Sequence, residues 1–123
     1  YPEFVDDIFN DTFIAELDRS NWRSSRNDPS INAPRNFAID REGNPIRVNR
    51  VGDTTMSAFQ ARGTTYDGAT RLLRASTPVT PGRHNLYLSI FDQGDRIFDS
   101  AVFLDNMGTT NAKECRTGVA LQK

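Results

Sequence analysis

Two stretches in the second half of the chain alternate hydrophobic and polar residues with the period of two that is typical of β-strands. Residues 84–91 (HNLYLSIF) and 96–104 (RIFDSAVFL) have this pattern, and the D-Q-G-D sequence at 92–95 between them has the composition of a turn. The apolar face of the first stretch consists of Leu86, Leu88 and Ile90. The pattern therefore predicts a β-hairpin over residues 84–104.

Shorter strand-like segments precede this hairpin. Residues 12–17 (TFIAEL) predict a strand, and 36–40 (NFAID) and 46–51 (IRVNRV) predict two strands joined by the turn R-E-G-N-P at 41–45. Further strands are expected at 55–61 and 70–75, and surface loops are expected at 20–35 and 63–68.

About seven short strands at this spacing predict an all-β fold, an antiparallel β-sandwich or a jelly-roll-like arrangement. Residues 1–107 are expected to form one β-sandwich domain, and 108–123 a tail or a last strand. The composition agrees, because the chain has 12 Asp, 11 Thr and 10 Asn but only 4 Glu and 2 Lys. Asp, Asn and Thr favour turns and strands, whereas Glu and Lys favour helices.

Composition also excludes several classes of protein. A net charge of −1 does not favour a nucleic-acid partner, and no apolar run approaches the roughly 20 residues of a membrane-spanning helix. A single Cys excludes an internal disulfide, and a single His excludes a three-His metal centre. The chain has no phosphate-binding loop, dinucleotide-binding glycine pattern or G-x-S-x-G motif, so we do not expect an enzyme.

Several segments together resemble one family. The sequence Y-P-E-F-V at 1–5, followed by F-N-D-T-F at 9–13, resembles the Y-P-E-F … F-N-D-x-F segment of bacterial choice-of-anchor L domains. The sequences T-Y-D-G at 65–68, A-S-T-P-V-T-P-G at 75–82 and D-S-A-V-F-L at 99–104 resemble the closing half of that family, in the same order. The resemblance extends to about residue 106 and is weakest between 19 and 60.

The resemblance implies a non-catalytic, β-rich module of a secreted or cell-surface bacterial protein, serving adhesion or extracellular assembly. In the family, an S-E-E stretch and an N-terminal half of the domain precede the position of Tyr1. We therefore expect the chain to be a processed product or the C-terminal part of a larger domain. Strands that lack their partners expose edges. The expected partner is a protein, either the missing half or a neighbouring subunit, and the alternative function is a filament subunit completed by strand donation.

The candidate metal site is acidic. The oxygen-bearing residues Asp6, Asp7, Asn10 and Asp11 lie within six positions. Ca²⁺ takes six to eight oxygen ligands, so this cluster predicts Ca²⁺ as a stabilising cofactor, and the alternative is a polar turn in which Asp and Asn cap backbone amides. Asp99 is a further candidate, because a carboxylate in the middle of a predicted strand must find a partner or a metal if it points inward. The alternative is a solvent-facing Asp99 on an edge strand.

The remaining candidates concern partners. Trp22, Arg23, Arg26 and Tyr66 are expected in loops, where an aromatic ring beside Arg stacks on a sugar or fills a protein pocket. These residues predict a carbohydrate-binding module as a second alternative function, unless Trp22 packs back on its own sheet. Cys115 predicts a disulfide to a cysteine outside this chain, or a free buried thiol. His84 is interpreted as the start of a strand rather than as a catalytic base.

Overall fold

The computed structural model describes residues 10–25, 28–49, 51, 54–94, 97 and 99–122, and in this part of the chain every regular element is a strand. The strands are β1 (Thr12–Leu17), β2 (Arg23–Ser25), β3 (Asp28–Asn32), β4 (Ile46–Arg47), β5 (Leu73–Ser76), β6 (Leu86–Phe91) and β7 (Gly118–Leu121). All of their pairings are antiparallel. The all-β class with seven short strands is confirmed. The sandwich stays a prediction, because the described strands form three small sheets.

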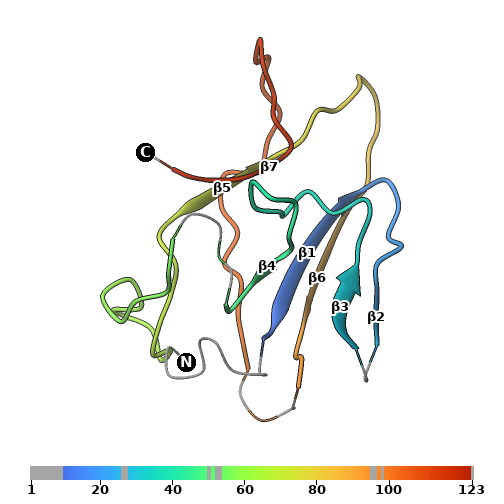
Figure 1. The fold of residues 1–123 in the computed structure, drawn as a ribbon. Coiled ribbons are helices and arrows are strands. Elements are labelled where there is room, and N and C mark those ends of the chain that lie inside the picture. Colours follow the sequence, from blue (N-terminus) through green and yellow to red (C-terminus); the bar gives the residue numbers. More distant parts are fainter. Residues whose placement is uncertain are drawn as a thin grey trace.

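The largest sheet has the strand order β4-β1-β6, with β1 in the centre (Figure 1). The whole of β1 pairs with the whole of β6, from Thr12 opposite Phe91 to Leu17 opposite Leu86. Both faces of β1 are covered, since Ile14 is 0% and Ala15 2% exposed although they point to opposite faces. This explains why the segment TFIAEL, predicted as a strand, carries apolar side chains on both sides.

The predicted hairpin over residues 84–104 is wrong. The strand β6 forms as expected, but it pairs with β1, and residues 97 and 99–104 are not in a strand. One physical reason lies at the start of β1. The carboxylate of Asp11 accepts a hydrogen bond from the Gln93 N–H (3.1 Å) and another from the Ser100 hydroxyl (2.6 Å). These two bonds hold both sides of the predicted turn against β1 instead of leaving them to pair with each other.

Three other segments also differ from, or refine, the predictions. Residues 20–35, expected as a loop, contain the antiparallel pair β2–β3. Residues 55–61, expected as a strand, contain no strand: Ser57 forms an isolated bridge with Ala69, and a turn begins at residue 58. The turn at 41–45 is confirmed: the Asp40 carboxylate accepts the backbone N–H groups of Glu42 and Asn44, each at 2.9 Å.

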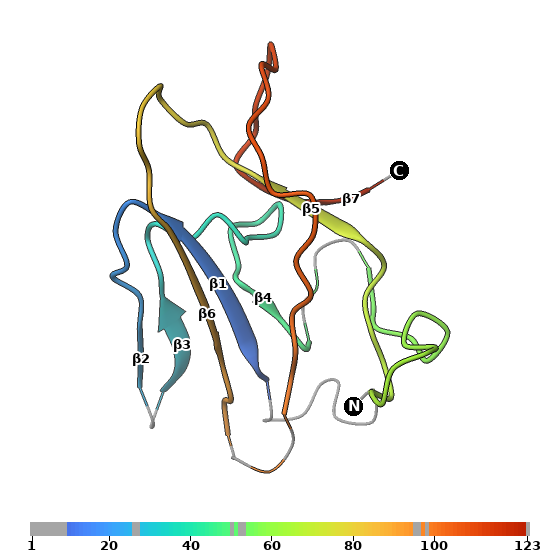
Figure 2. The ribbon, with the colours of Figure 1, turned by 180° about the vertical axis from the view of Figure 1, so that it is seen from behind.

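The hydrophobic core is small. Ala15, Ala38 and Val119 are buried together, and the partly buried side chains packed on them are Phe13, Phe37, Ile46 and Leu73. Val119 belongs to β7, close to the C-terminus, and β7 pairs with β5 (Figure 2). Gly118 makes this approach possible, since its φ is +134° and a Cβ there would stand 3.1 Å from the Ile39 carbonyl oxygen.

Candidate functional site

The predicted metal cluster lies only partly in the described structure. Asp6 and Asp7 are outside the described residues. The Asn10 N–H donates to the Gln93 carbonyl (3.2 Å), and its side-chain oxygen accepts the N–H of Asn49 (3.0 Å). With the two bonds of the Asp11 carboxylate, these contacts join the start of β1 to two distant loops. Both described members of the cluster therefore carry structural hydrogen bonds.

The Asp11 carboxylate also borders a cavity of about 50 Å³. The cavity is lined on its apolar side by Phe13, Ile46, Val51, Ile90 and Val102. Cavities of this size hold a water molecule or so, whereas small-molecule sites generally occupy about 300–1,000 Å³. This cavity is thus of a size that suits a bridging solvent molecule.

Asp99 is exposed and lies next to Ser100, the residue whose hydroxyl binds Asp11. It is not in a strand, so the premise that a carboxylate interrupts a sheet does not hold for it. Across residues 10–25, 28–49, 51, 54–94, 97 and 99–122, no three His, Cys, Asp or Glu side chains come together as a set that could hold a metal ion. Calcium binding thus stays a prediction that depends on Asp6 and Asp7.

Trp22 packs back on its own sheet. Its indole N–H donates to the Ser89 hydroxyl at 3.0 Å, and its ring stacks on Phe91 with the centroids 4.5 Å apart and the planes within 1°. The side chain is half-buried. One ring face is therefore occupied by Phe91, and the indole fastens the β1–β2 connection to β6.

The other predicted contact residues do not gather around Trp22. Arg23 is exposed on β2, and Arg26 is outside the described residues. Tyr66 is half-buried in the loop 63–68, which lies on the opposite side of the largest sheet from β2 (Figures 1 and 2). The structure thus does not bring Trp22 and Tyr66 into one aromatic platform.

Cys115 is exposed. It lies in residues 101–117, all of which are exposed, and whose outer part projects away from the body beyond β5 and β7 (Figure 1). The buried-thiol alternative is therefore wrong. The disulfide to a cysteine outside this chain stays a prediction.

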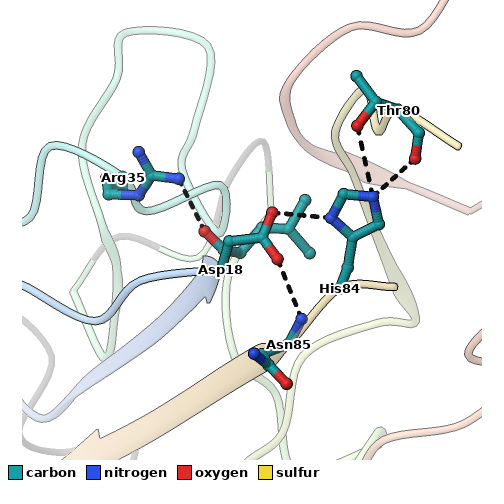
Figure 3. A network of polar contacts seen from close by, with 6 residues as sticks. Asp18, Arg35, Thr80, His84 and Asn85 are labelled. Atoms are coloured by element: carbon teal, nitrogen blue, oxygen red, sulfur yellow. Dashed lines mark hydrogen bonds and ion pairs between the residues drawn. The ribbon is translucent and has the colours of Figure 1, made fainter. Parts of the chain in front are cut away.

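One polar cluster was not predicted from the sequence, and it joins the end of β1 to the start of β6 (Figure 3). Asp18 has a φ of +67°, a left-handed conformation that Asp tolerates better than most residues. Its carboxylate bonds the His84 Nδ1 at 2.7 Å and accepts the Asn85 N–H at 3.1 Å. The other ring nitrogen, Nε2, lies 2.6 Å from the Thr80 carbonyl oxygen.

These partners decide the charge of His84. Carboxylate and carbonyl oxygens only accept hydrogen bonds, so these contacts are satisfied best when both ring nitrogens carry protons, which favours the imidazolium form. The hydrogen bond that His84 donates to the Asp18 carboxylate raises the pKa of His84, and the one it donates to the Thr80 carbonyl raises it further. In turn, the bonds from His84 and Asn85 lower the pKa of Asp18.

The cluster resembles a hydrolytic triad only in its residue types. The Thr80 hydroxyl lies 3.5 Å from the His84 Nε2, but a base needs a free lone pair on that nitrogen. Here the proton on Nε2 is directed at the Thr80 carbonyl. The arrangement is therefore a charged clasp between two strands, with no activated nucleophile.

Several large hydrophobic side chains of the described residues are exposed. The exposed large hydrophobic side chains include Leu86, Leu88 and Ile90 of β6 at 39%, 42% and 45% exposure. Within residues 101–107 they include Phe103, Leu104 and Met107 at 80%, 52% and 68%. Contiguous apolar surface on a soluble domain marks a site that contacts another molecule. The strongest candidate site is thus a contact surface rather than a pocket.

The described residues thus form an all-β body with a polar clasp and exposed apolar side chains. The chain belongs to the choice-of-anchor L domain family, whose model matches residues 1–110 and confirms the resemblance in the sequence. Membership places it among modules of secreted or surface-anchored bacterial proteins. Comparison with curated proteins found no match, and comparison with solved structures found none either. No helix among the described residues is long and apolar enough to cross a membrane.

Proposed function

We propose that the chain is a non-catalytic protein-contact module that serves adhesion or assembly outside the bacterial cell. The observation that carries this proposal is the exposed segment 101–107, where Phe103, Leu104 and Met107 face solvent. Exposing such side chains in water is unfavourable by about 25 cal/mol per Å² of apolar surface, so a partner that covers them gains this energy. A contact role accounts for the exposure of these apolar side chains in the free chain.

Two observations support the absence of catalysis. The ring nitrogens of His84 are both engaged as donors, which leaves no base at the one histidine of the chain. The cavity beside Asp11 has a volume of about 50 Å³, below the size that a bound substrate needs.

Calcium stabilisation and strand donation are finer forms of this proposal, and carbohydrate binding is an alternative to it. Calcium would bind through Asp6, Asp7, Asn10 and Asp11. Carbohydrate binding is the weaker alternative, because Phe91 covers one face of the Trp22 ring and Tyr66 lies in a distant loop. Strand donation is supported by the position of β6 at the end of its sheet.

An attachment assay tests the proposal. Beads coated with the chain at high density are passed under flow over surfaces coated with the same chain, with casein or with a panel of glycans. We expect attachment to the protein-coated surfaces, reduced in the double variant Phe103→Ser and Met107→Ser. The matched control is Phe59→Ser, because Phe59 is 64% exposed in a different loop.

Two outcomes would argue against the contact role. Attachment that the double variant and the control reduce equally would mean that residues 101–107 have no special part. Attachment to glycans alone would favour the carbohydrate-binding alternative.

A further inference from the structure

The strand β6 ends the largest sheet on one side, and no described strand pairs with its outer edge. Two hydrogen bonds just beyond the ends of β1 show which way the backbone groups of β6 point. The Asn10 N–H donates to the Gln93 carbonyl, and the Asp18 N–H donates to the Asn85 carbonyl. In an antiparallel pair, alternate residues point their backbone groups toward the partner. Odd-numbered residues of β6 therefore face β1, and Leu86, Leu88 and Ile90 direct their N–H and C=O groups outward.

This edge lacks the features that protect natural edge strands. Such strands are usually short or bulged, or they carry charges or proline. The sequence of β6 is LYLSIF, with six residues and no charge, proline or glycine. The β2–β3 pair lies on the same side of the molecule, but it reaches β6 through Trp22, which contacts the face formed by Ser89 and Phe91. The backbone edge itself stays available.

The two ends of β6 carry opposite charges. Arg83 precedes the strand and the exposed Asp92 follows it, whereas the charge of His84 is balanced by Asp18 of the same copy. Antiparallel pairing of two identical strands brings the first end of each copy to the second end of the other. The strand is thus complementary to itself in charge as well as in hydrophobicity.

We propose that β6 pairs in antiparallel fashion with β6 of a second copy of this chain, with Leu88 opposite Leu88. In this register Leu86 lies opposite Ile90 of the second copy, and His84 lies opposite its Asp92. Opposite residues in an antiparallel pair share a face, so the two exposed apolar strips join into one. The two three-stranded sheets become one continuous sheet.

This pairing is one form of the assembly role proposed above and rests on that proposal for its biological meaning. The two can fail separately, because the attachment assay depends on Phe103 and Met107 whereas the pairing depends on Leu88.

Sedimentation velocity over a range of protein concentrations tests the pairing in solution. We expect a reversible dimer that Leu88→Lys weakens by about tenfold or more, since two lysines would then face each other directly. Leu88 is 42% exposed, so the monomer should tolerate the change, and circular dichroism checks that it stays folded. The matched control is Leu72→Lys, at a site that is 65% exposed and outside β6, and it should dimerise as the wild type does.

Cross-linking tests the register. In a Cys115→Ser background, Leu88→Cys places two thiols on residues whose Cα atoms are about 5.5 Å apart in a hydrogen-bonded pair, within the range that a disulfide spans. We expect a covalent dimer from this variant and much less from Leu86→Cys, whose two copies lie on opposite sides of the centre. A wild type that stays monomeric throughout, equal loss in Leu72→Lys, or equal cross-linking at both cysteines would overturn the proposal.

Discussion

Replacing the buried residue Asn36 by Ala should strongly destabilise the fold. The Asn36 side chain is only 6% exposed, and its oxygen accepts the N–H groups of Ala15 and Ala38, both at 2.9 Å. Its amide nitrogen donates to the Ala38 carbonyl at 3.2 Å. The side chain thereby connects the central strand β1 to the segment that leads into β4.

The magnitude follows from the two orphaned donors. Ala15 and Ala38 are 2% and 1% exposed, so water cannot readily replace the lost acceptor. Each buried donor left unsatisfied costs about 1–3 kcal/mol, which gives about 2–6 kcal/mol for the pair. Domains are stable by about 5–15 kcal/mol in total, so the loss is a large fraction of the stability.

Urea unfolding measures this loss. With a slope near 2 kcal/mol per molar urea, a loss of about 3 kcal/mol lowers the midpoint by about 1.5 M. The control Asn111→Ala, at an exposed position, should stay within about 0.5 kcal/mol of the wild type. If the variant does not fold, slow hydrogen exchange at the Ala15 and Ala38 amides of the wild type replaces the measurement. Equal midpoints in both variants, or rapid exchange at these amides, would refute the reasoning.

Three further predictions concern the clasp, a glycine and the acidic cluster. The variant His84→Gln should be less stable than the wild type mainly between about pH 4 and 6.5. Thermal unfolding at a series of pH values measures this difference in melting temperature. The raised pKa of His84 makes its contribution fade as pH rises above the usual 6.5, and the lowered pKa of Asp18 makes the contribution fade as pH falls below 3.8. A stability gap that does not vary with pH would contradict the charged clasp. Gly118→Ala should lower the melting temperature whereas Gly108→Ala should not, because only Gly118 combines a φ of +134° with a close carbonyl; equal effects would show that the close approach is unimportant. Calcium should raise the melting temperature and chelator should lower it, as for any ligand that binds only the folded state; identical curves would remove calcium from the proposal.

Local pattern located some of the strands, but it missed β2 and β3, placed strands at 55–61 and 96–104 where the described residues form none, and did not predict which strands pair. The segment TFIAEL was predicted at the bounds that β1 has, and the apolar alternation in 84–91 located β6. The partner of β6 was predicted wrongly, because a nearby strand-like stretch and a turn sequence favour a local hairpin. The bonds from Asp11 to Gln93 and Ser100, which oppose that hairpin, join residues more than 80 positions apart and leave no local signal.

The polar side chains show the same division. Asp40 and its turn were predictable, because its hydrogen bonds reach only two and four positions along the chain. The partnership of Asp18 with His84 spans 66 positions, and that of Trp22 with Ser89 spans 67. Alone, the sequence showed a single histidine, interpreted as the start of a strand, and a single tryptophan, for which a ligand and packing on its own sheet were the alternatives, and it named the partner of neither.

The sequence by itself determined the all-β class, the central strand, the family and the surface setting that the family implies. These depend on alternation, composition and short motifs, which a chain carries before it folds. Only the tertiary structure decided that β6 pairs with β1, that His84 is held as a cation, and that the apolar residues of β6 and of 101–107 stay exposed. Such properties depend on contacts between residues that are far apart in the chain, and on how much apolar surface a small core of Ala15, Ala38 and Val119 is able to cover.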